Sequence, residues 1–468
     1  MPALLKFYKW GISMSLSFLT ITFVPGKMFQ DKDVIKVSHS LYHYWSLDAD
    51  RDLTLKIGKK ERLVAIEPAS IPKDEIHMDS GLFSYFQLAE EDIRLIVQYA
   101  GGDRRLAAGP IIGLMTEASE DHEEVSFRSV HSFCGELQAG IEEFGGIFYV
   151  FHIKDFRESG LSGYCWRDGR WVKEQVPFPT VIYNRIHSRK LESGKYFGNF
   201  KYKLQELGIP MFNDCFLSKD LVYDILAGEE HMKPYLPETR LLGARTLENM
   251  LSRYHEVFIK PVNGSQGRNI VRLSLAENKL SASFSSAGAK DAGKSFPDCA
   301  AFFKWFEPQL RTRMYLVQEP IQLASLNGRQ LDFRVLCHKG PQNSWRATSA
   351  VARISAEQQF VSNIARGGET MKPVKALTLI ADKATAVQQA ALMKELAVEA
   401  AGIISNASEG IVGELGMDLG IDRQGKLWII EANSKPSKNF EEADQRIRPS
   451  AKALIEYFIW LSFQAAKS

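Results

Sequence analysis

Short stretches in which apolar and polar residues alternate fill the first part of the chain. They include LSFLTITF, DVIKVSH, LTLKIG and RLVAIEP within residues 12–69, and Pro25-Gly26 and Gly58 interrupt them. A period of two places every second side chain on one face of a strand, and Gly and Pro favour the turns between strands. Residues 1–102 are therefore predicted to form an N-terminal β-rich module.

The pattern changes after Gly101-Gly102-Asp103, which we take as the end of this module. GPIIGLMT (Gly109–Thr116) is a continuous apolar run, typical of a buried parallel strand. A helix-like segment follows, and then come two further strand-like runs, GGIFYVFHI and TVIYNRI. Strands that alternate with helical segments predict an α/β sheet, which we assign to residues 103–211.

The remaining residues mix helical and strand-like segments. Ser218 is a candidate N-cap of a helix that Pro234 and Pro237 would end, and EVFIKPV is predicted to be a strand. Residues 276–297 are rich in small residues and lysine, which favours a hairpin or loop. Two more helices are predicted, from about residue 385 to residue 401 and from about residue 450 onwards.

Composition limits the class of protein. Of the 468 residues, 45% are hydrophobic and 24% are charged, which excludes a mostly disordered chain. Lys and Arg number 58 and Asp and Glu 56, a net charge of +2, so the chain has no overall electrostatic reason to bind nucleic acid. The five cysteines include no CxxC pair and favour a reducing compartment over disulfides or a zinc site: Cys134, Cys165, Cys215, Cys299 and Cys337.

The start of the chain has one feature of a secretory signal. Lys6 and Lys9 precede GISMSLSFLTITFV, but this run ends in Pro25-Gly26 without an A-x-A-like cleavage site. We favour short strands here and keep a signal peptide as the alternative. No run of about 18 apolar residues exists elsewhere, so we expect no membrane span and a cytoplasmic location.

Three groups of residues carry chemistry, and the first is FIKPVNGSQGRNIV. A strand ends near Lys260, and Gly264 and Gly267 follow among small polar residues. Exposed N–H groups of a glycine-rich turn can bind phosphate oxygens, and a nearby ammonium neutralises their charge. The order of a P-loop is absent, and an apolar strand follows instead of a helix. A hairpin turn without a ligand remains open as the alternative.

The second group lies in GELGMDLGIDRQGKLWIIEANSKPS. A hairpin turn at residues 422–425, with a loop of two or four residues, would place Asp418 opposite Glu431, and Asn433 on the same face. Two carboxylates so close repel each other unless a cation lies between them. Oxygen-only ligands favour Mg²⁺, which usually binds one or two carboxylates together with substrate phosphates. An exposed hairpin with solvated acids is the alternative.

The third group is rich in arginine. Asp332 and Arg334 share one face of the strand DFRVL, and Arg353 and Arg366 follow, the latter in NIARGG. Arginine can bind phosphate or carboxylate oxygens through two parallel hydrogen bonds, which lysine cannot. Surface ion pairs are the alternative for any single arginine.

In this order, these motifs resemble the ATP-grasp superfamily, and more narrowly the endospore coat-associated YheC/YheD-type ATP-grasp proteins. The narrower resemblance spans most of the chain, through GPIIGLMT, PTVIYNRIHSR, KPVNGSQGRNI, VQEPIQL, LDFRVL, NIARGGE, GELGMDLGID and LWIIEANSKPS. It implies an α/β (α+β) protein with an ATP-grasp fold, in which two α+β subdomains grip ATP. These would be residues 212–314 and 315–468, preceded by an α/β pre-ATP-grasp domain and the β-rich module.

The resemblance also implies roles for individual residues toward ATP. Lys219 and Lys260 would hold the α- and β-phosphates, and Gly264, Ser265 and Gly267 would form a lid over the triphosphate. The adenine slot would be lined by Gln318, Glu319 and Ile321, where backbone groups pair with the base edge.

Metal and acceptor roles follow in the same way from the resemblance. One or two Mg²⁺ ions would be bound by Asp418, Glu431 and Asn433. The γ-phosphate or the acceptor carboxylate would be faced by Arg334, Arg353 and Arg366. Two departures from the family pattern concern Asn269, which tolerates left-handed geometry, and Pro320, which removes a backbone donor from the presumed hinge.

The activity implied is that of a carboxylate–amine ligase that forms an amide or peptide bond through an acyl phosphate. Its partners would be small-molecule or peptide carboxylates and amines, and possible spore-coat proteins by resemblance alone. One alternative is an ATP-binding coat-assembly or structural protein without turnover, and another is a kinase-like phosphotransferase. Arg185 and Arg189 either bind an anionic substrate or brace a domain interface.

Overall fold

The computed structural model describes residues 18–26, 33–121, 124–214, 216–264, 269–276, 279–285, 293–355, 368–438 and 447–464. The chain divides into two compact units. The first unit draws on residues 1–214, 339–344 and 443–468, and the second unit on residues 215–338 and 345–442.

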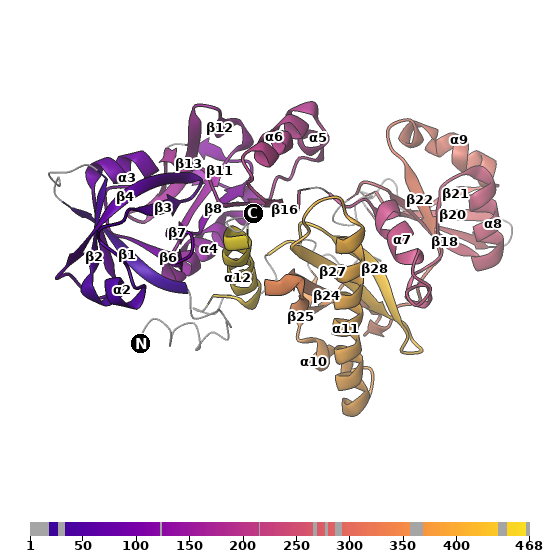
Figure 1. The fold of residues 1–468 in the computed structure, drawn as a ribbon. Coiled ribbons are helices and arrows are strands. Elements are labelled where there is room, and N and C mark those ends of the chain that lie inside the picture. The colour runs from indigo at the N-terminus through magenta and orange to yellow at the C-terminus, as the bar shows by residue number, and fades with distance from the viewer. Residues whose placement is uncertain are drawn as a thin grey trace. The chain divides into compact units, whose positions relative to one another are not determined.

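A closed β-barrel opens the first unit, as Figure 1 shows in indigo. Its strands follow the order β1-β5-β2-β4-β3-β7-β6, and β1 pairs antiparallel with β6 to close it. The barrel strands are β1 (Phe18–Gly26), β2 (Val34–Ser38), β3 (Leu53–Ile57), β4 (Lys60–Ala69), β5 (Glu75–Asp79), β6 (Ile93–Ala100) and β7 (Arg105–Gly109). The alternation seen in the sequence produces this barrel, because every second residue of β3 is buried inside it.

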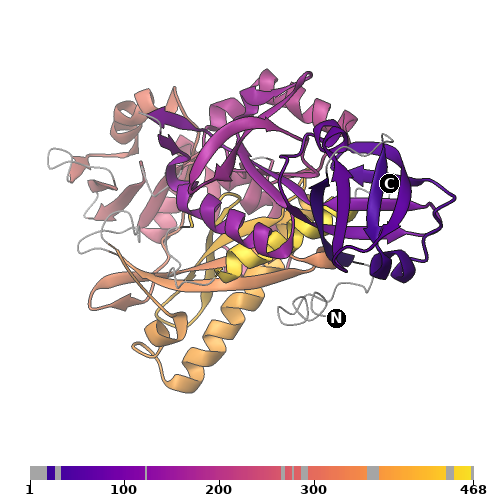
Figure 2. The ribbon, with the colours of Figure 1, turned by 90° about the vertical axis from the view of Figure 1, so that its left-hand side faces the viewer.

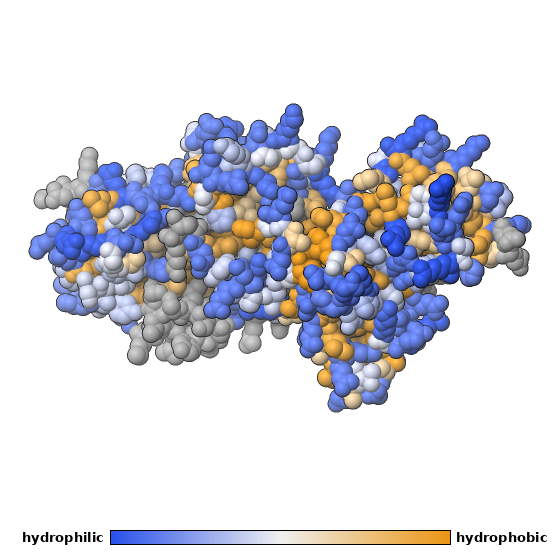
Figure 3. All heavy atoms as spheres, turned by 45° about the vertical axis from the view of Figure 1, so that its right-hand side comes forward, coloured by the Kyte–Doolittle hydropathy of each residue, from blue (hydrophilic) through white to orange (hydrophobic). Residues whose placement is uncertain are grey.

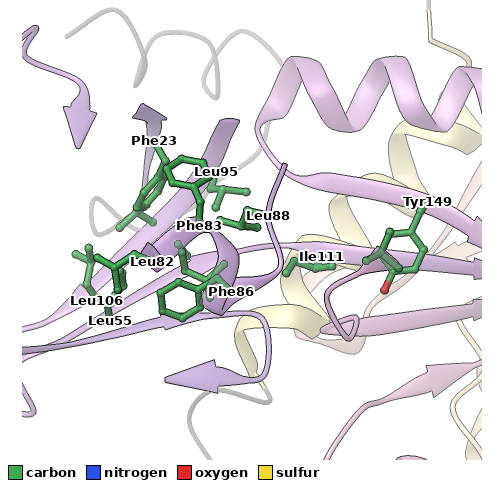
Figure 4. Packing of buried hydrophobic residues seen from close by; sticks show 14 of the residues in the cluster. Phe23, Leu55, Leu82, Phe83, Phe86, Leu88, Leu95, Leu106, Ile111 and Tyr149 are labelled. Atoms are coloured by element: carbon green, nitrogen blue, oxygen red, sulfur yellow. The ribbon is translucent and has the colours of Figure 1, made fainter. Parts of the chain in front are cut away.

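Two short helices accompany the barrel, α2 (His39–Tyr44) and α3 (Ser80–Phe86). The carboxylate of Asp79 accepts the N–H of Leu82 at 2.7 Å and so caps α3. Figure 4 shows Phe83 and Phe86 of this helix among the buried side chains of the barrel strands. Burying one such side chain contributes about 1.5–3 kcal/mol, which fixes α3 on the barrel.

The boundary predicted at residues 102 and 103 is wrong. Gly101-Gly102-Asp103 lies in the turn between β6 and β7, and Ala100 of β6 pairs with Arg105 of β7 on either side of this turn. The barrel therefore continues to Gly109. Gly101-Gly102-Asp103 therefore lies in a hairpin turn inside the module and does not mark its end.

An α/β sheet follows in the first unit, as the continuous apolar runs predict. Its order is β12-β13-β11-β8-β15-β16, with β14 paired to β13. The parallel strands are β8 (Ile111–Met115), β11 (Ile147–Phe151), β15 (Val181–Asn184) and β16 (Met211–Phe212). The antiparallel extension consists of β12 (Phe156–Arg157), β13 (Gly160–Arg167) and β14 (Arg170–Val176).

The helices of this part are α4 (His131–Phe144), α5 (Arg189–Glu192) and α6 (Lys195–Glu206), with 3-10 turns η1 (Arg128–Val130) and η2 (Ile153–Asp155). A small hairpin consists of β9 (Ser119–Asp121) and β10 (Glu124–Ser126). Every residue of β8 is buried, which explains why its sequence is apolar without alternation.

The last helix, α12 (Pro449–Gln464), belongs to the first unit. The prediction that placed it in an ATP-grasp subdomain of residues 315–468 is therefore wrong. Figure 2 shows this yellow helix beside α4, and it also packs on β15. Phe458 contacts the rings of Tyr183 and Phe212, and Ser462 accepts a 2.8 Å hydrogen bond from Thr180. Because α12 is apolar on nearly all sides, it needs partners on several faces.

The second unit contains two sheets. The first follows the order β17-β22-β18-β19-β20-β21 and the second β26-β25-β24-β27-β28, with β23 paired to β24. The strands of the first sheet are β17 (Thr239–Leu241), β18 (Glu256–Pro261), β19 (Val271–Ala276), β20 (Lys279–Phe284), β21 (Lys294–Phe296) and β22 (Tyr315–Gln318). Those of the second are β23 (Ser325–Leu326), β24 (Arg329–Lys339), β25 (Trp345–Ile354), β26 (Glu369–Met371), β27 (Glu414–Ile421) and β28 (Leu427–Asn433).

Helices cover both sheets of this unit. The long helix α11 runs along the second sheet in Figure 1, where it packs on β25 and β27. The helices are α7 (Lys219–Ala227), α8 (Ala244–Tyr254), α9 (Cys299–Leu310), α10 (Pro373–Leu377) and α11 (Lys383–Ala407), with 3-10 turns η3 (Lys233–Tyr235) and η4 (Pro341–Asn343), the latter in the first unit.

The predicted helix after Ser218 is present as α7, with Ser218 at its N-cap position. It ends at Ala227, with Gly228 as the C-cap, and not near Pro234. The strand predicted from EVFIKPV is β18, and the helix predicted from residue 385 is α11. Residues 276–297 contain two short strands and segments outside the described residues.

Hydrophilic side chains cover most of the face in Figure 3, with apolar patches between them. Across the described residues, we find no helix that combines the length and apolar character needed to cross a membrane. Cys134, Cys165, Cys299 and Cys337 are free thiols, and Cys215 lies outside the described residues.

Candidate functional site

Lys260 lies on β18 of the second unit, at the end of the strand before the glycine-rich turn. Its ammonium donates to the side-chain carbonyl of Gln318 on β22 at 2.5 Å. Burial, and then the nearby ammonium of Lys219, lower the pKa of Lys260 to about 8. A cation held by a neutral amide beside a second cation favours the arrival of an anion.

Lys219 provides that second cation from the first turn of α7. Its ammonium lies 2.7 Å from Oε1 of Glu431 on β28 and donates to the carbonyl of Gly264 at 3.2 Å. The backbone N–H of Lys219 also donates to Val262 at 3.3 Å. One lysine thus links α7, the glycine-rich turn and β28.

Gly264 has a steric reason to be glycine. A Cβ atom at this position would lie 2.7 Å from Cγ of Pro261, closer than such atoms pack. At the far end of the turn, Asn269 has a φ of 58°, the left-handed conformation expected for it. Ser265 and Gly267, the other predicted lid residues, lie outside the described residues.

The predicted adenine residues follow β22. The Gln318 amide also donates to the Thr239 hydroxyl at 2.8 Å, so this side chain is held from both ends. Glu319 already donates its backbone N–H to Glu238 at 2.9 Å, and this donor is therefore not available to a base edge. Ile321 is half-buried and accepts the N–H of Leu323 at 2.9 Å.

The predicted pairing of Asp418 with Glu431 is confirmed, but the turn that produces it differs. Asp422 and Lys426 close a loop of three residues, whereas a loop of two or four residues was predicted. The Asp422 carboxylate stabilises this loop because it accepts the N–H groups of Gln424 and Lys426 at 2.9 Å. A β-bulge between Asp418 and Leu419 shifts the register by one residue and restores the predicted pair.

Asp418 is buried between two arginines. Arg334 on β24 forms two parallel hydrogen bonds with its carboxylate, and Arg353 on β25 approaches to 3.3 Å. Burial alone would raise the pKa of Asp418, but the two guanidinium groups lower it. Arg353 also donates to Asp332 at 2.5 Å, which confirms that Asp332 and Arg334 share a strand face.

The predicted metal ligands fit Mg²⁺ in part. Asp418, Glu431 and Asn433 occupy one end of the β27–β28 ladder and offer only oxygen donors to a cation. However, the guanidinium groups and Lys219 already supply the positive charge that the two carboxylates need. Over the described residues, no group of three or more His, Cys, Asp or Glu is placed to hold a metal ion. A bound Mg²⁺ would therefore have to replace cationic side chains.

Three further predicted residues remain. Arg366 lies outside the described residues. Arg185 follows β15 in the first unit, is 3% exposed and lies over the ring of Tyr183. Arg189 is the first residue of α5 in the same unit.

Sequence reasoning missed a buried network near the site. His338 on β24 pairs with Glu414 on β27, and their side chains lie 2.8 Å apart. Lys438 contacts the same carboxylate from the segment that follows β28. All three are almost fully buried, so they anchor the segment after Asn433. In the sequence, the apolar residues near Glu414 were the signal that this carboxylate is buried.

Comparisons with known proteins find sequences similar to this chain. A family model described as YheC/D like ATP-grasp matches residues 208–461. Endospore coat-associated protein YheD of Bacillus subtilis (strain 168) is 29% identical over 377 residues, covering 78% of this chain and 82% of that protein. Endospore coat-associated protein YheC of the same organism is 22% identical over 335 residues, covering 68% and 88%.

Solved structures also resemble the chain, at a lower level. The D-alanine–D-alanine ligase from Coxiella burnetii matches with a TM-score of 0.43 and 13% identity, over 76% of this chain and 96% of that chain. A likeness of this size carries no argument about function.

Proposed function

This chain belongs to the YheC/D-like ATP-grasp family, and on that premise we propose that it is an ATP- and Mg²⁺-dependent carboxylate–amine ligase. On this proposal, the two sheets of the second unit and the helices that cover them would form the two α+β halves of the ATP-grasp fold. In the proposed reaction a substrate carboxylate attacks the γ-phosphate of ATP and ADP leaves. An amine then attacks the carbon of the acyl phosphate, and phosphate leaves as the amide or peptide bond forms.

The pair of Lys219 and Lys260 carries this proposal. Lys260 contacts a neutral amide, and burial beside Lys219 lowers its pKa. The α- and β-phosphates of ATP would supply the missing negative charge at this point. Phosphate binding here would draw Lys219 away from Glu431, which now holds it.

The glycine-rich turn and the hinge complete the proposed nucleotide site. Gly264, Ser265 and Gly267 would cover the triphosphate, and Gly264 lies too close to Pro261 to carry a side chain. Because the Glu319 N–H is already bonded, the base would be read by the groups after Pro320, around Ile321.

Asp418, Glu431 and Asn433 would hold Mg²⁺. When bound, the ion would neutralise the charge of the transferred phosphoryl group. Arg334 and Arg353 hold Asp418 in place, and on this proposal they and Arg366 would face the γ-phosphate or the acceptor carboxylate. Removing one such fixed contact should cost about 10²–10³ in rate.

A second candidate is an ATP-binding protein of coat assembly that keeps the fold without turnover. The names of its two curated relatives, both endospore coat-associated proteins, favour this candidate, as does the full neutralisation of Asp418 by arginine. Association with the spore coat and a cytoplasmic location stay predictions.

ADP release with Mg-ATP and pooled amino acids or short peptides tests the ligase. We expect ADP release that depends on the acceptor and an amide product in the mass spectrum. Lys260→Met should abolish both, while Lys304→Met, at an exposed lysine of α9, should change neither. Nucleotide binding without acceptor-dependent ADP would favour the second candidate, and a stable phosphorylated acceptor would indicate a phosphotransferase.

A further inference from the structure

Two neighbouring parallel strands of the first unit, β8 and β15, end side by side. Asn184 pairs with Met115, and the N–H of Arg185 donates to the carbonyl of Met115 at 2.8 Å. The pairing thus continues beyond both strand ends. The next residues of the two segments, Glu117 and His187, therefore come together at the carboxyl edge of the sheet.

Glu117 is held firmly at this edge. Its carboxylate accepts the backbone N–H groups of His187 and Ser188, each at 3.0 Å, and lies 3.1 Å from Nδ1 of the His187 ring. Burial alone would raise the pKa of Glu117, but these hydrogen bonds lower it to about 2. The carboxylate therefore stays ionised and fixes the orientation of the imidazole.

The other ring nitrogen of His187 faces a hydroxyl. Nε2 lies 2.9 Å from Oγ of Ser129, whereas Nδ1 faces Glu117. With the proton on Nδ1, the imidazole accepts the serine proton at Nε2. The hydroxyl, imidazole and carboxylate follow the order of a nucleophile, a base and an orienting acid.

The backbone presents Ser129 to solvent. Ser129 lies in the 3-10 turn η1, directly before the fourteen-residue helix α4, and its side chain is exposed. Arg128, the residue before it, has a φ of 52°, a left-handed conformation that costs a residue with a Cβ about 1–3 kcal/mol. The η1 turn leads directly into α4, where the N–H of His131 donates to the carbonyl of Arg128 and no side chain caps the helix.

The position in the sheet is one where α/β proteins bind ligands. β8 lies between β11 and β15, and the chain passes from β8 first to the neighbour on one side and later to the other. Ligands of open α/β sheets bind at the carboxyl ends of the strands where the order reverses in this way. Glu117 follows β8 and His187 follows β15, so the three side chains lie at that position.

We propose that Ser129, His187 and Glu117 form a second catalytic site, which cleaves a carboxylic ester or amide by acyl transfer to serine. Its residues all belong to the first unit, whereas the proposed nucleotide site uses residues of the second. The Ser129 Oγ forms a bond to the acyl carbon while its proton passes to Nε2 of His187. That proton then leaves with the alcohol or amine, and water releases the acid by the same route. Glu117 is the positioning residue.

A fluorophosphonate probe tests this site on the full chain without ATP or Mg²⁺, so the result does not depend on the ligase proposal. Attack by Ser129 forms an O–P bond and expels fluoride. We expect the mass spectrum of the digested protein to place the phosphonate on Ser129, and the protein to hydrolyse p-nitrophenyl acetate.

Variants separate this chemistry from a structural role. Ser129→Ala should remove the label, while Ser132→Ala, at an exposed serine in the first turn of α4, should keep it. His187→Gln should slow labelling at least about 10²-fold, the usual size of a general-base contribution. Glu117→Gln should lower the maximal labelling rate but leave the probe concentration for half-maximal rate unchanged.

Two results would overturn the proposal. One is the absence of any label on Ser129 when thermal unfolding shows that the protein used in the assay is folded. The other is labelling that His187→Gln leaves as fast as before, because Ser129 would then be merely an exposed hydroxyl.

Discussion

The ammonium of Lys219 lies 2.7 Å from the carboxylate of Glu431, although 212 residues separate them in the chain. The first comes from the start of α7 and the second from the end of β28. Each residue was predicted to contact a different part of a Mg-ATP complex, but in this structure they contact each other. Nucleotide binding on the proposed site is therefore an exchange of partners.

This exchange predicts opposite effects of one substitution with and without metal. Glu431→Gln removes the charge that holds Lys219 and repels phosphate. Without Mg²⁺, we expect the variant to bind ATP more tightly, by about three- to tenfold, which corresponds to roughly 0.7–1.4 kcal/mol. With Mg²⁺ it should bind more weakly. Titration calorimetry measures both, and Glu395→Gln on the exposed side of α11 is the control. Weaker binding under both conditions would contradict the exchange.

Lys260 predicts a dependence of stability on pH. Its pKa is about 8 in the folded protein and near 10.5 when unfolded. Between these values the unfolded chain binds more protons, so the free energy of unfolding rises with pH over this range. Lys260→Met lacks this contribution. Urea unfolding at pH 7.5 and pH 10 should therefore show that the free energy of unfolding of the wild type, relative to that of Lys260→Met, increases with pH. An equal difference at both pH values would mean that Lys260 titrates normally.

Arg334 and Asp418 predict a strong coupling. Among the described residues, Arg334→Met leaves Arg353 as the guanidinium beside the buried Asp418 carboxylate, and we expect a loss of about 3–5 kcal/mol in unfolding free energy. The double variant Arg334→Met/Asp418→Asn should recover much of this loss, because no buried charge remains unpaired. A double-mutant cycle from denaturant unfolding measures the coupling. Additive losses would show that the two side chains act independently.

Gly264 predicts a steric effect with a matched control. Gly264→Ala places a methyl group against Pro261 and should lower the unfolding free energy by about 1–3 kcal/mol. Gly402→Ala, inside helix α11 where the nearest atom lies 4.0 Å away, should instead raise it by about 0.5–1 kcal/mol. Thermal unfolding measures both. If both changes stabilised the protein, the turn would have to differ from the one described.

The sequence predicted those features that depend on local pattern. The apolar run at residues 111–115 and the alternation in β3 led to the correct kinds of strand, because burial on two faces or one leaves a direct trace. The pairing of Asp418 with Glu431 was also correct, although an unforeseen bulge compensated for a turn of the wrong length. Local spacing therefore predicted which residues face each other across β27 and β28.

What spacing could not supply was the partner of each charged group. Arg334, Arg353 and Lys219 were expected to face ligands, and instead they neutralise Asp418 and Glu431. Such contacts join strands that are distant in sequence, and an arginine suits a phosphate and a carboxylate equally well. The same holds for α12, whose place in the first unit depends on apolar contacts with Tyr183 and Phe212.

The return of α12 to the first unit also affects how the protein is made. A ribosome must synthesise the whole second unit before the helix that packs on α4 and β15 emerges. At about 5–20 residues per second, the earlier part waits many seconds with those apolar surfaces uncovered. Nascent chains should therefore need protection from aggregation until their last turns are translated, and a premature stop codon shortly before Pro449 should be as damaging as one much earlier.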